Sequence, residues 1–226
     1  MPNHVTNKIS AEVAQLLASE DRQIDFNRVI PMPVSLHDPD PQQMESRAKA
    51  ALGMFKEPTG EPESLSDLTD RMELSTTIKG LFKPIERESI GLLIQAIQNI
   101  AEYGFAYWYP WAVHNWGTKW NAYEVESDGD FVTFQTAWAH PEPVFLKLSA
   151  ENPEISIKVE YADEDIGSNC GTVVYKAGAI EQQDIAPNWN TMSDGEKDHW
   201  RRFALGLTDP ENVEERIAEY ALEDDE

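Results

Sequence analysis

Apolar residues alternate with polar ones in several short segments, a spacing that predicts β-strands. The clearest is 155–161, in which isoleucine, valine and tyrosine occupy every second position. Asp128-Gly129 marks a tight turn, so we expect a β-hairpin over 120–138. β-like segments are found at residues 3–9, 24–30, 123–126, 131–138, 155–161, 171–175 and 179–185.

Apolar residues at intervals of three and four positions predict helices elsewhere. The strongest pattern is Glu86–Tyr103, and Gly104 is placed to end this helix. Ser10 and Ser64 are suitable N-caps for two others. Besides 86–103, helices are expected at residues 10–17, about 42–55, 64–71, 141–151, 193–207 and 209–222.

The predicted elements follow the order β-α-insertion-β-β-α-β, and a β-hairpin and helices end the chain. A ferredoxin-like sandwich requires this βαββαβ order, with two helices on one face of an antiparallel sheet. We therefore expect an α+β fold with a single domain over 1–226. A helical insertion is expected at about 34–118 and an acidic C-terminal helical tail at about 193–226. The insertion, the long helix or the C-terminal helices would cover the other face of the sheet.

Five motifs are similar to those of a known family. They are Met1-Pro2-Asn3-His4-Val5-Thr6-Asn7, Phe26-Asn27-Arg28-Val29-Ile30-Pro31-Met32-Pro33, Asn115-Trp116-Gly117-Thr118-Lys119-Trp120-Asn121-Ala122, Phe134-Gln135-Thr136-Ala137-Trp138 and Tyr161-Ala162-Asp163-Glu164-Asp165-Ile166-Gly167. On these motifs the chain resembles the YubB-type ferredoxin-like domain family of plasmid- and phage-encoded proteins. The resemblance implies an α+β fold and a mobile-element origin, and it implies no catalytic residues.

Acidic residues strongly outnumber basic ones. The chain has 41 Asp and Glu against 18 Lys and Arg, a formal charge of −23. The excess is greatest in residues 114–226, which carry 25 acidic and 8 basic side chains. Because such a chain repels polyanions, we expect no direct binding to nucleic acid. The excess serves either solubility or the binding of a basic partner.

Few features of the sequence are typical of an enzyme or a metalloprotein. The single cysteine, Cys170, excludes an intramolecular disulfide and a four-cysteine iron–sulfur cluster, and we expect it to be a buried, inert thiol. The five histidines lack metal-ligand spacing, and His114 is expected to be a core or capping residue. We therefore expect no catalysis, no cofactor and no metal. Without a signal peptide or a membrane-spanning run, a cytoplasmic location is expected.

An aromatic cluster surrounds Trp116-Gly117-Thr118-Lys119-Trp120. It has two interpretations. It is either the core where the helices meet the sheet, or a ligand pocket formed by Trp116, Lys119 and Trp120, with Lys119 over a ring face. Gly117 is expected to supply a positive φ at the turn into the hairpin.

Carboxylates gather at two places in the C-terminal half. Asp163-Glu164-Asp165 follow a strand, and they form a solvated turn, a protein contact or, least favoured, a Ca²⁺ or Mg²⁺ site. The tail supplies four more candidate contact residues: Glu211, Glu214, Glu215 and Glu219. If the loop and the tail share a face, its charge density is comparable to that of duplex DNA.

These features favour a non-enzymatic protein that binds and inhibits a host nucleic-acid-handling protein, such as a restriction or CRISPR defence component. The loop and tail carboxylates would replace phosphates opposite the basic surface of that partner. The alternative is a small-ligand-binding module, or an enzyme of unknown reaction, with its pocket around Trp116–Trp120. A structural or accessory subunit is a third possibility.

Overall fold

The computed structural model describes residues 3–38, 40–54 and 89–223. The chain separates into two compact units, one formed by Met1–Pro31 with Ala112–Glu226 and the other by Met32–Trp111. The second unit overlaps the range in which the sequence predicts an insertion. The single domain with an insertion at about 34–118 stays a prediction.

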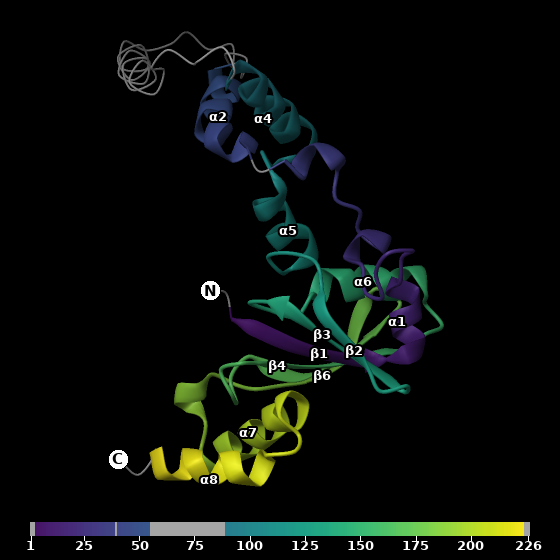
Figure 1. The fold of residues 1–226 in the computed structure, drawn as a ribbon, viewed down its shortest axis with the longest axis vertical. Helices are drawn as coiled ribbons and strands as arrows, with labels where there is room; N and C mark the ends of the chain where they lie inside the picture. The colour runs from purple at the N-terminus through teal and green to yellow at the C-terminus, as the bar shows by residue number, and fades with distance from the viewer. Residues whose placement is uncertain (1–2, 39, 55–88, 224–226) are drawn as a thin grey trace, which may run out of the picture. The chain divides into compact units, whose positions relative to one another are not determined.

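A six-stranded antiparallel sheet forms the centre of the first unit, with strand order β2-β3-β1-β4-β5-β6 (Figure 1). The first four strands have the order of a ferredoxin-like sheet, and the β5–β6 hairpin extends it beyond β4. The predicted α+β fold with an antiparallel ferredoxin-like sheet is therefore confirmed. The strands are β1 (His4–Ser10), β2 (Tyr123–Ser127), β3 (Phe131–Ala137), β4 (Ile157–Asp163), β5 (Cys170–Lys176) and β6 (Ala179–Ile185).

Helices cover both faces of this sheet (Figure 1). On one face lie α1 (Ala11–Leu17) and α6 (Glu142–Glu151), the two helices of the ferredoxin-like order. On the other face α7 (Asp194–Thr208) packs against β4, β5 and β1, and α8 (Val213–Glu223) packs on α7. The sequence left three candidates for the cover of this second face, and the structure places the C-terminal helices there.

Strand alternation decides which side chains face each layer. Ile157, Val159 and Tyr161 of β4 are buried, as are Val144 and Phe145 of α6, in the positions that the sequence pattern predicts. On the α7 face a smaller core forms from residues of β4, β5, α7 and the 3₁₀ turn before α7: Ala162, Cys170, Met192, Trp200 and Ala204.

Local capping explains where the helices of this unit begin. The Ser10 hydroxyl accepts a hydrogen bond from the Val13 N–H and caps α1. Ser193 and Glu196 form a capping box at the start of α7. Asp209, which the sequence analysis places at the start of the last helix, is instead the C-cap of α7, and α8 begins at Val213.

Two segments differ from the sequence prediction. Residues 24–30 do not form a strand: Phe26–Arg28 is a 3₁₀ turn, because Asp25 Oδ1 accepts a hydrogen bond from the Asn27 N–H and fixes the turn. The strand predicted over 155–161 ends two residues later than expected, because β4 continues to Asp163.

The second unit is helical. It contains α2 (Glu45–Met54), α4 (Ser89–Tyr103) and the first residues of α5 (Trp108–Trp116), together with short 3₁₀ turns at Val34–Leu36 and Asp40–Met44. Gly104 ends α4 with φ +81°, as expected. The helix predicted over 64–71 lies outside the described residues. The core of the second unit is formed by Met44, Ala48, Ala96, Ala106 and Tyr107.

Candidate functional site

The three carboxylates at the end of β4 and in the loop that follows it have different environments. Asp163 is only 4% exposed. It accepts hydrogen bonds from Asn3 Nδ2 (3.2 Å), Asn169 Nδ2 (2.8 Å) and the Asp165 N–H (3.0 Å). Its carboxylate therefore holds the loop together and is not displayed to a partner, which corrects its place among the candidate contact residues. Glu164 and Asp165 are exposed.

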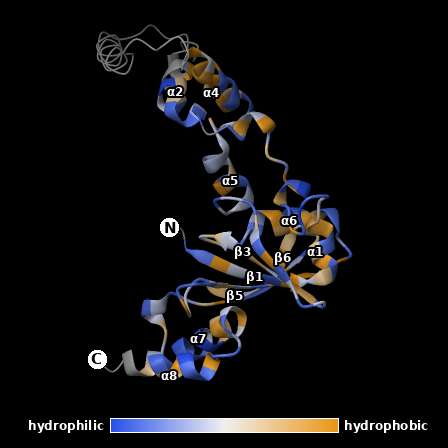
Figure 2. Ribbon diagram, viewed as in Figure 1, coloured by the Kyte–Doolittle hydropathy of each residue, from blue (hydrophilic) through white to orange (hydrophobic). Residues whose placement is uncertain are grey.

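The four candidate acids of the C-terminal segment are all exposed. Two are already compensated: Glu214 pairs with Arg202 at 2.6 Å, and Glu219 lies 3.5 Å from Arg216. The structure describes no ion pair for Glu211 or Glu215. Much of α7 and α8 is hydrophilic (Figure 2).

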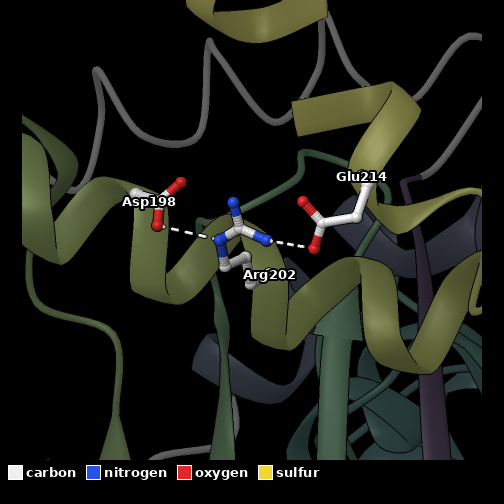
Figure 3. Close-up of polar contacts among 3 residues, drawn as sticks. All are labelled: Asp198, Arg202 and Glu214. Atoms are coloured by element: carbon white, nitrogen blue, oxygen red, sulfur yellow. Dashed lines mark hydrogen bonds and ion pairs between the residues drawn. The ribbon is translucent and has the colours of Figure 1, made fainter. Parts of the chain in front are cut away.

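Arg202 joins the two C-terminal helices (Figure 3). Its Nε donates to Asp198 Oδ2 at 2.9 Å, one turn earlier in α7. Its terminal nitrogen Nη1 donates to Glu214 Oε1 of α8 at 2.6 Å. Both pairs are largely exposed, so they orient α8 more than they stabilise the fold.

Aromatic rings hold the same helices to the rest of the unit. The Arg201 guanidinium lies 4.8 Å from the centre of the Trp189 ring and 4.7 Å from that of Tyr220. Gly167, with φ +92°, passes so close that an added Cβ would lie 2.8 Å from Trp189. The loop after β4 therefore lies in close contact with Trp189 and with Arg201 of α7.

A cavity of about 360 Å³ brings the loop and the C-terminal segment together. Glu164 from the loop, Asp209 after α7 and Arg216 of α8 all line it. Gln135 of β3 and Thr6 of β1 line it from the sheet side. Glu164 of the loop and Asp209 at the start of the C-terminal segment therefore lie at the same cavity of the first unit.

The Trp-Gly-Thr-Lys-Trp motif has a structural role. Trp116 is 3% exposed, and its indole N–H donates to the Ile30 carbonyl at 2.9 Å. The Thr118 hydroxyl bonds to both backbone groups of Ala137. Gly117 has φ +78°, as expected. These bonds fasten the segment before Pro31 and the strand β3 to the turn that precedes the hairpin.

Lys119 and Trp120, the last two residues of this motif, are half-buried. The Lys119 ammonium is 4.6 Å from the centre of the Trp120 ring and 5.2 Å from that of Trp138. The expected cation–π contact is present, but Trp116 is core. The burial of Trp116 favours the core interpretation, and a pocket formed by the three side chains stays a prediction.

Burial governs the remaining reactive groups. Burial raises the pKa of Cys170 to about 12, and its side chain is 1% exposed, as expected of an inert thiol. His114 is exposed in the last turn of α5 and is not a core residue. Among the described residues, no group of three His, Cys, Asp or Glu side chains is arranged to hold a metal ion. None of the helices in the described ranges is long and apolar enough to span a bilayer.

Comparison with known proteins bears on the fold of this part of the chain. Residues 115–201 match the family model described as the ferredoxin-like domain in Api92-like protein. The matched domain runs from the end of α5 into α7, and it contains Gln135, Glu164 and the Trp116 motif. The ferredoxin-like part of the family resemblance is thus confirmed.

The structural comparison found a distant similarity. The crystal structure of the protein api92 from Yersinia pseudotuberculosis is similar over 83% of this chain and 99% of that chain, with 11% sequence identity and a TM-score of 0.39. No curated protein matches the chain significantly.

Sequence reasoning missed Gln135 and Arg216 as possible site residues. They stand far apart in the sequence. Gln135 lies within one of the five family motifs, but neither residue belongs to a motif with a known chemical role. Gln135 pairs with Thr6 across β1 and β3. This pairing is known only once the register of the two strands is known, so the sequence alone gives no sign of it.

Proposed function

We propose that this chain binds and inhibits a host nucleic-acid-handling protein of a defence system through an acidic surface that imitates nucleic acid. The observation that carries the proposal is that Glu164 of the loop and Asp209 at the start of the C-terminal segment line one cavity. We call the surface of residues 164–165 and 209–219 the acidic face. The formal charge of −23 supports the same proposal.

Four carboxylates of the acidic face are available to a partner. Glu164, Asp165, Glu211 and Glu215 are exposed, and the structure describes no ion pair for any of them. Lysine or arginine side chains that normally contact phosphates would pair with these groups. Glu214 and Glu219 contribute less, because Arg202 and Arg216 already compensate them.

The mechanism is steric occlusion of a basic cleft. Attraction between opposite charges accelerates association and makes it sensitive to salt, and the bound protein then blocks the nucleic-acid site. The chain needs no catalytic residue, cofactor or metal for this action. The resemblance to the YubB-type family of plasmids and phages supplies the biological setting, a mobile element acting in the cytoplasm of a bacterial host.

The test is affinity capture from a bacterial lysate at low salt with the wild-type chain and the variant Glu211→Gln/Glu215→Gln. The expected result is that a nucleic-acid-handling protein binds the wild type, is displaced by duplex DNA and loses its own activity in the complex. The double variant should bind it at least about tenfold more weakly, since close charge pairs across interfaces contribute about 1.5 kcal/mol or more.

A matched control removes the same charge elsewhere. Glu126 on the β2–β3 hairpin and Glu154 before β4 are exposed, so Glu126→Gln/Glu154→Gln changes the net charge equally outside the acidic face. This control should retain binding. Equal loss in both variants would mean that total charge matters and the acidic face does not, and a partner that ignores DNA would overturn the mimicry.

A further inference from the structure

Trp138 has a backbone conformation that a bulky residue seldom adopts. It directly follows β3 and has φ +77°, in the left-handed region. Trp138 is still 39% exposed, so the strained backbone presents part of a large apolar ring to solvent. Strained residues persist where the surrounding structure fixes them, and they gather at binding and active sites. The conformation of Trp138 therefore points to a role for its exposed indole.

A set of hydrogen bonds holds Trp138 in this conformation. Its N–H donates to the Asn3 carbonyl at 2.9 Å, and its carbonyl accepts from Asn169 Nδ2 at 3.1 Å. The side chains of Asn3 and Asn169 also donate to the buried Asp163 carboxylate, at 3.2 Å and 2.8 Å. One carboxylate thus organises the contacts to both backbone groups of Trp138. A partner would meet an indole that is already in position.

The same hydrogen bonds place Trp138 beside the acidic loop. β3 and β4 lie on either side of β1 in the sheet. The N–H groups of Trp138 and Glu164, just after these two strands, donate to the carbonyls of Asn3 and His4 at the start of β1, each at 2.9 Å. The backbones of Trp138 and Glu164 are therefore about 10 Å apart, which is two strand spacings. The exposed indole borders the exposed carboxylates of Glu164 and Asp165.

Neighbouring side chains fix the ring as well as the backbone. The Lys119 ammonium lies over the Trp138 ring, 5.2 Å from its centre, and 4.6 Å from the centre of the Trp120 ring. Trp120 in turn contacts Tyr123 edge to face, with ring centres 6.2 Å apart. The Tyr123 hydroxyl lies 2.6 Å from Nδ1 of His4, which lines the cavity described above. A continuous series of contacts thus connects the indole to the acidic cavity.

We propose that the exposed indole of Trp138 imitates an unstacked base beside the carboxylates of Glu164 and Asp165, which imitate phosphates. This inference rests on the proposed function and names its partner class, a protein that holds single-stranded nucleic acid. Such proteins combine a basic groove along the nucleic-acid backbone with aromatic or arginine side chains on which bases stack. The bases of a duplex are stacked on one another, so a ring displayed beside carboxylates resembles a single strand and not a duplex.

The first test is a competition at fixed salt, with the full chain and the partner that it captures. Single-stranded oligo(dT) or oligo(U) and a duplex with the same number of nucleotides are compared as competitors. The duplex should displace the partner through its phosphates alone. The single strand should do so at a concentration at least about tenfold lower, since the stacking of one base on an aromatic side chain contributes about this factor.

Variants of Trp138 test the ring directly. Trp138→Ala should weaken binding of the partner about tenfold or more, whereas Trp138→Phe keeps an aromatic ring and should retain most of the affinity. Phe131→Ala is the matched control, because Phe131 is 42% exposed at the other end of β3, and it should bind as the wild type does. Trp138→Gly separates binding from folding. Glycine adopts a positive φ without strain, so this variant should lose the partner and unfold at a temperature no lower than that of Trp138→Ala.

The inference alone is overturned if Glu211→Gln/Glu215→Gln loses the partner while Trp138→Ala binds it as well as the wild type does. A duplex that competes as well as the single strand, or equal loss in Phe131→Ala, also overturns it and leaves the proposed function standing. If no nucleic-acid-handling protein is captured, the proposed function fails and the inference fails with it. Circular dichroism shows whether each variant is folded, and the competition on the wild type decides if Trp138→Ala is not.

Discussion

The Nε2 atom of His140 lies 2.6 Å from the phenol oxygen of Tyr175 inside the first unit. Tyr161 stacks on the same imidazole, with ring centres 4.2 Å apart. Burial lowers the pKa of His140 to about 4 and raises the pKa of Tyr161 to about 12, and it raises the pKa of Tyr175 further. All three rings are therefore uncharged at neutral pH, and the buried hydrogen bond between His140 and Tyr175 joins two uncharged groups.

His140 should make the fold sensitive to mild acid. Because its pKa is lowered from 6.5 to about 4 in the folded chain, the unfolded chain binds a proton that the folded chain excludes as the pH falls through this window. The difference corresponds to a loss of about 3 kcal/mol in the free energy of unfolding by pH 4. Denaturant unfolding at several pH values across the window measures it.

The variant His140→Gln should remove this part of the pH dependence, although it is less stable at neutral pH. His199→Gln is the control, because His199 is exposed on α7. It should keep the slope of the wild type. A wild-type slope in the His140 variant would show that other groups cause the acid sensitivity.

Substitution of Thr136 should strongly reduce the free energy of unfolding. It is fully buried, and its hydroxyl accepts a hydrogen bond from Asn7 Nδ2 at 2.8 Å and donates to the Ala139 carbonyl at 2.8 Å. Thr136→Val removes these bonds at unchanged volume, and we expect a loss of about 1–3 kcal/mol in the free energy of unfolding. Thr133→Val, three residues earlier in β3 and only half-buried, should cost less than about 0.5 kcal/mol. Equal costs would contradict the role of the buried network.

The alternation of apolar and polar residues, together with helix capping, made much of the first unit predictable from the sequence. The hairpin over 120–138, the strand over 155–161 and the start of α7 at Ser193 depend on neighbouring residues, which the sequence displays directly. Residues 24–30 have the composition of a strand, yet Asp25 and a long-range hydrogen bond from Asn121 Nδ2 (2.7 Å) fix them as a turn. A contact between residues so distant leaves no local signal.

The candidate site was less predictable for the same reason. The sequence identified the acidic loop and tail, but it did not reveal that Asp163 is an internal hydrogen-bond acceptor while Glu164 is exposed. Adjacent residues of a strand end point in opposite directions, so the exposure depends on where β4 ends. The cavity depends on the β1–β3 register and on the docking of α8, and both are tertiary.

Gly167 should be intolerant of substitution. It has φ +92°, and an added Cβ would lie 2.8 Å from Trp189 and 3.1 Å from the Arg201 side chain. Gly167→Ala should therefore reduce the free energy of unfolding by about 1–3 kcal/mol. Gly206→Ala is the matched control, because Gly206 lies within α7 with open space around it, and it should stabilise the chain by up to about 1 kcal/mol. A neutral Gly167→Ala would mean that the loop after β4 can move away from Trp189.

The reaction rate of the Cys170 thiol should show whether α7 separates from the sheet. Its thiol is 1% exposed in the core between β5 and α7, and burial raises its pKa from 9.0 to about 12. The thiolate is the reactive form, so at a given pH the raised pKa alone lowers reactivity about a thousandfold. Ellman's reagent should therefore react with the native chain at a rate that rises with denaturant in parallel with unfolding. An exposed reference thiol, Ala179→Cys in a Cys170→Ser background, should react at once. Native Cys170 reacting within a few-fold of that reference would mean that α7 leaves the sheet without global unfolding.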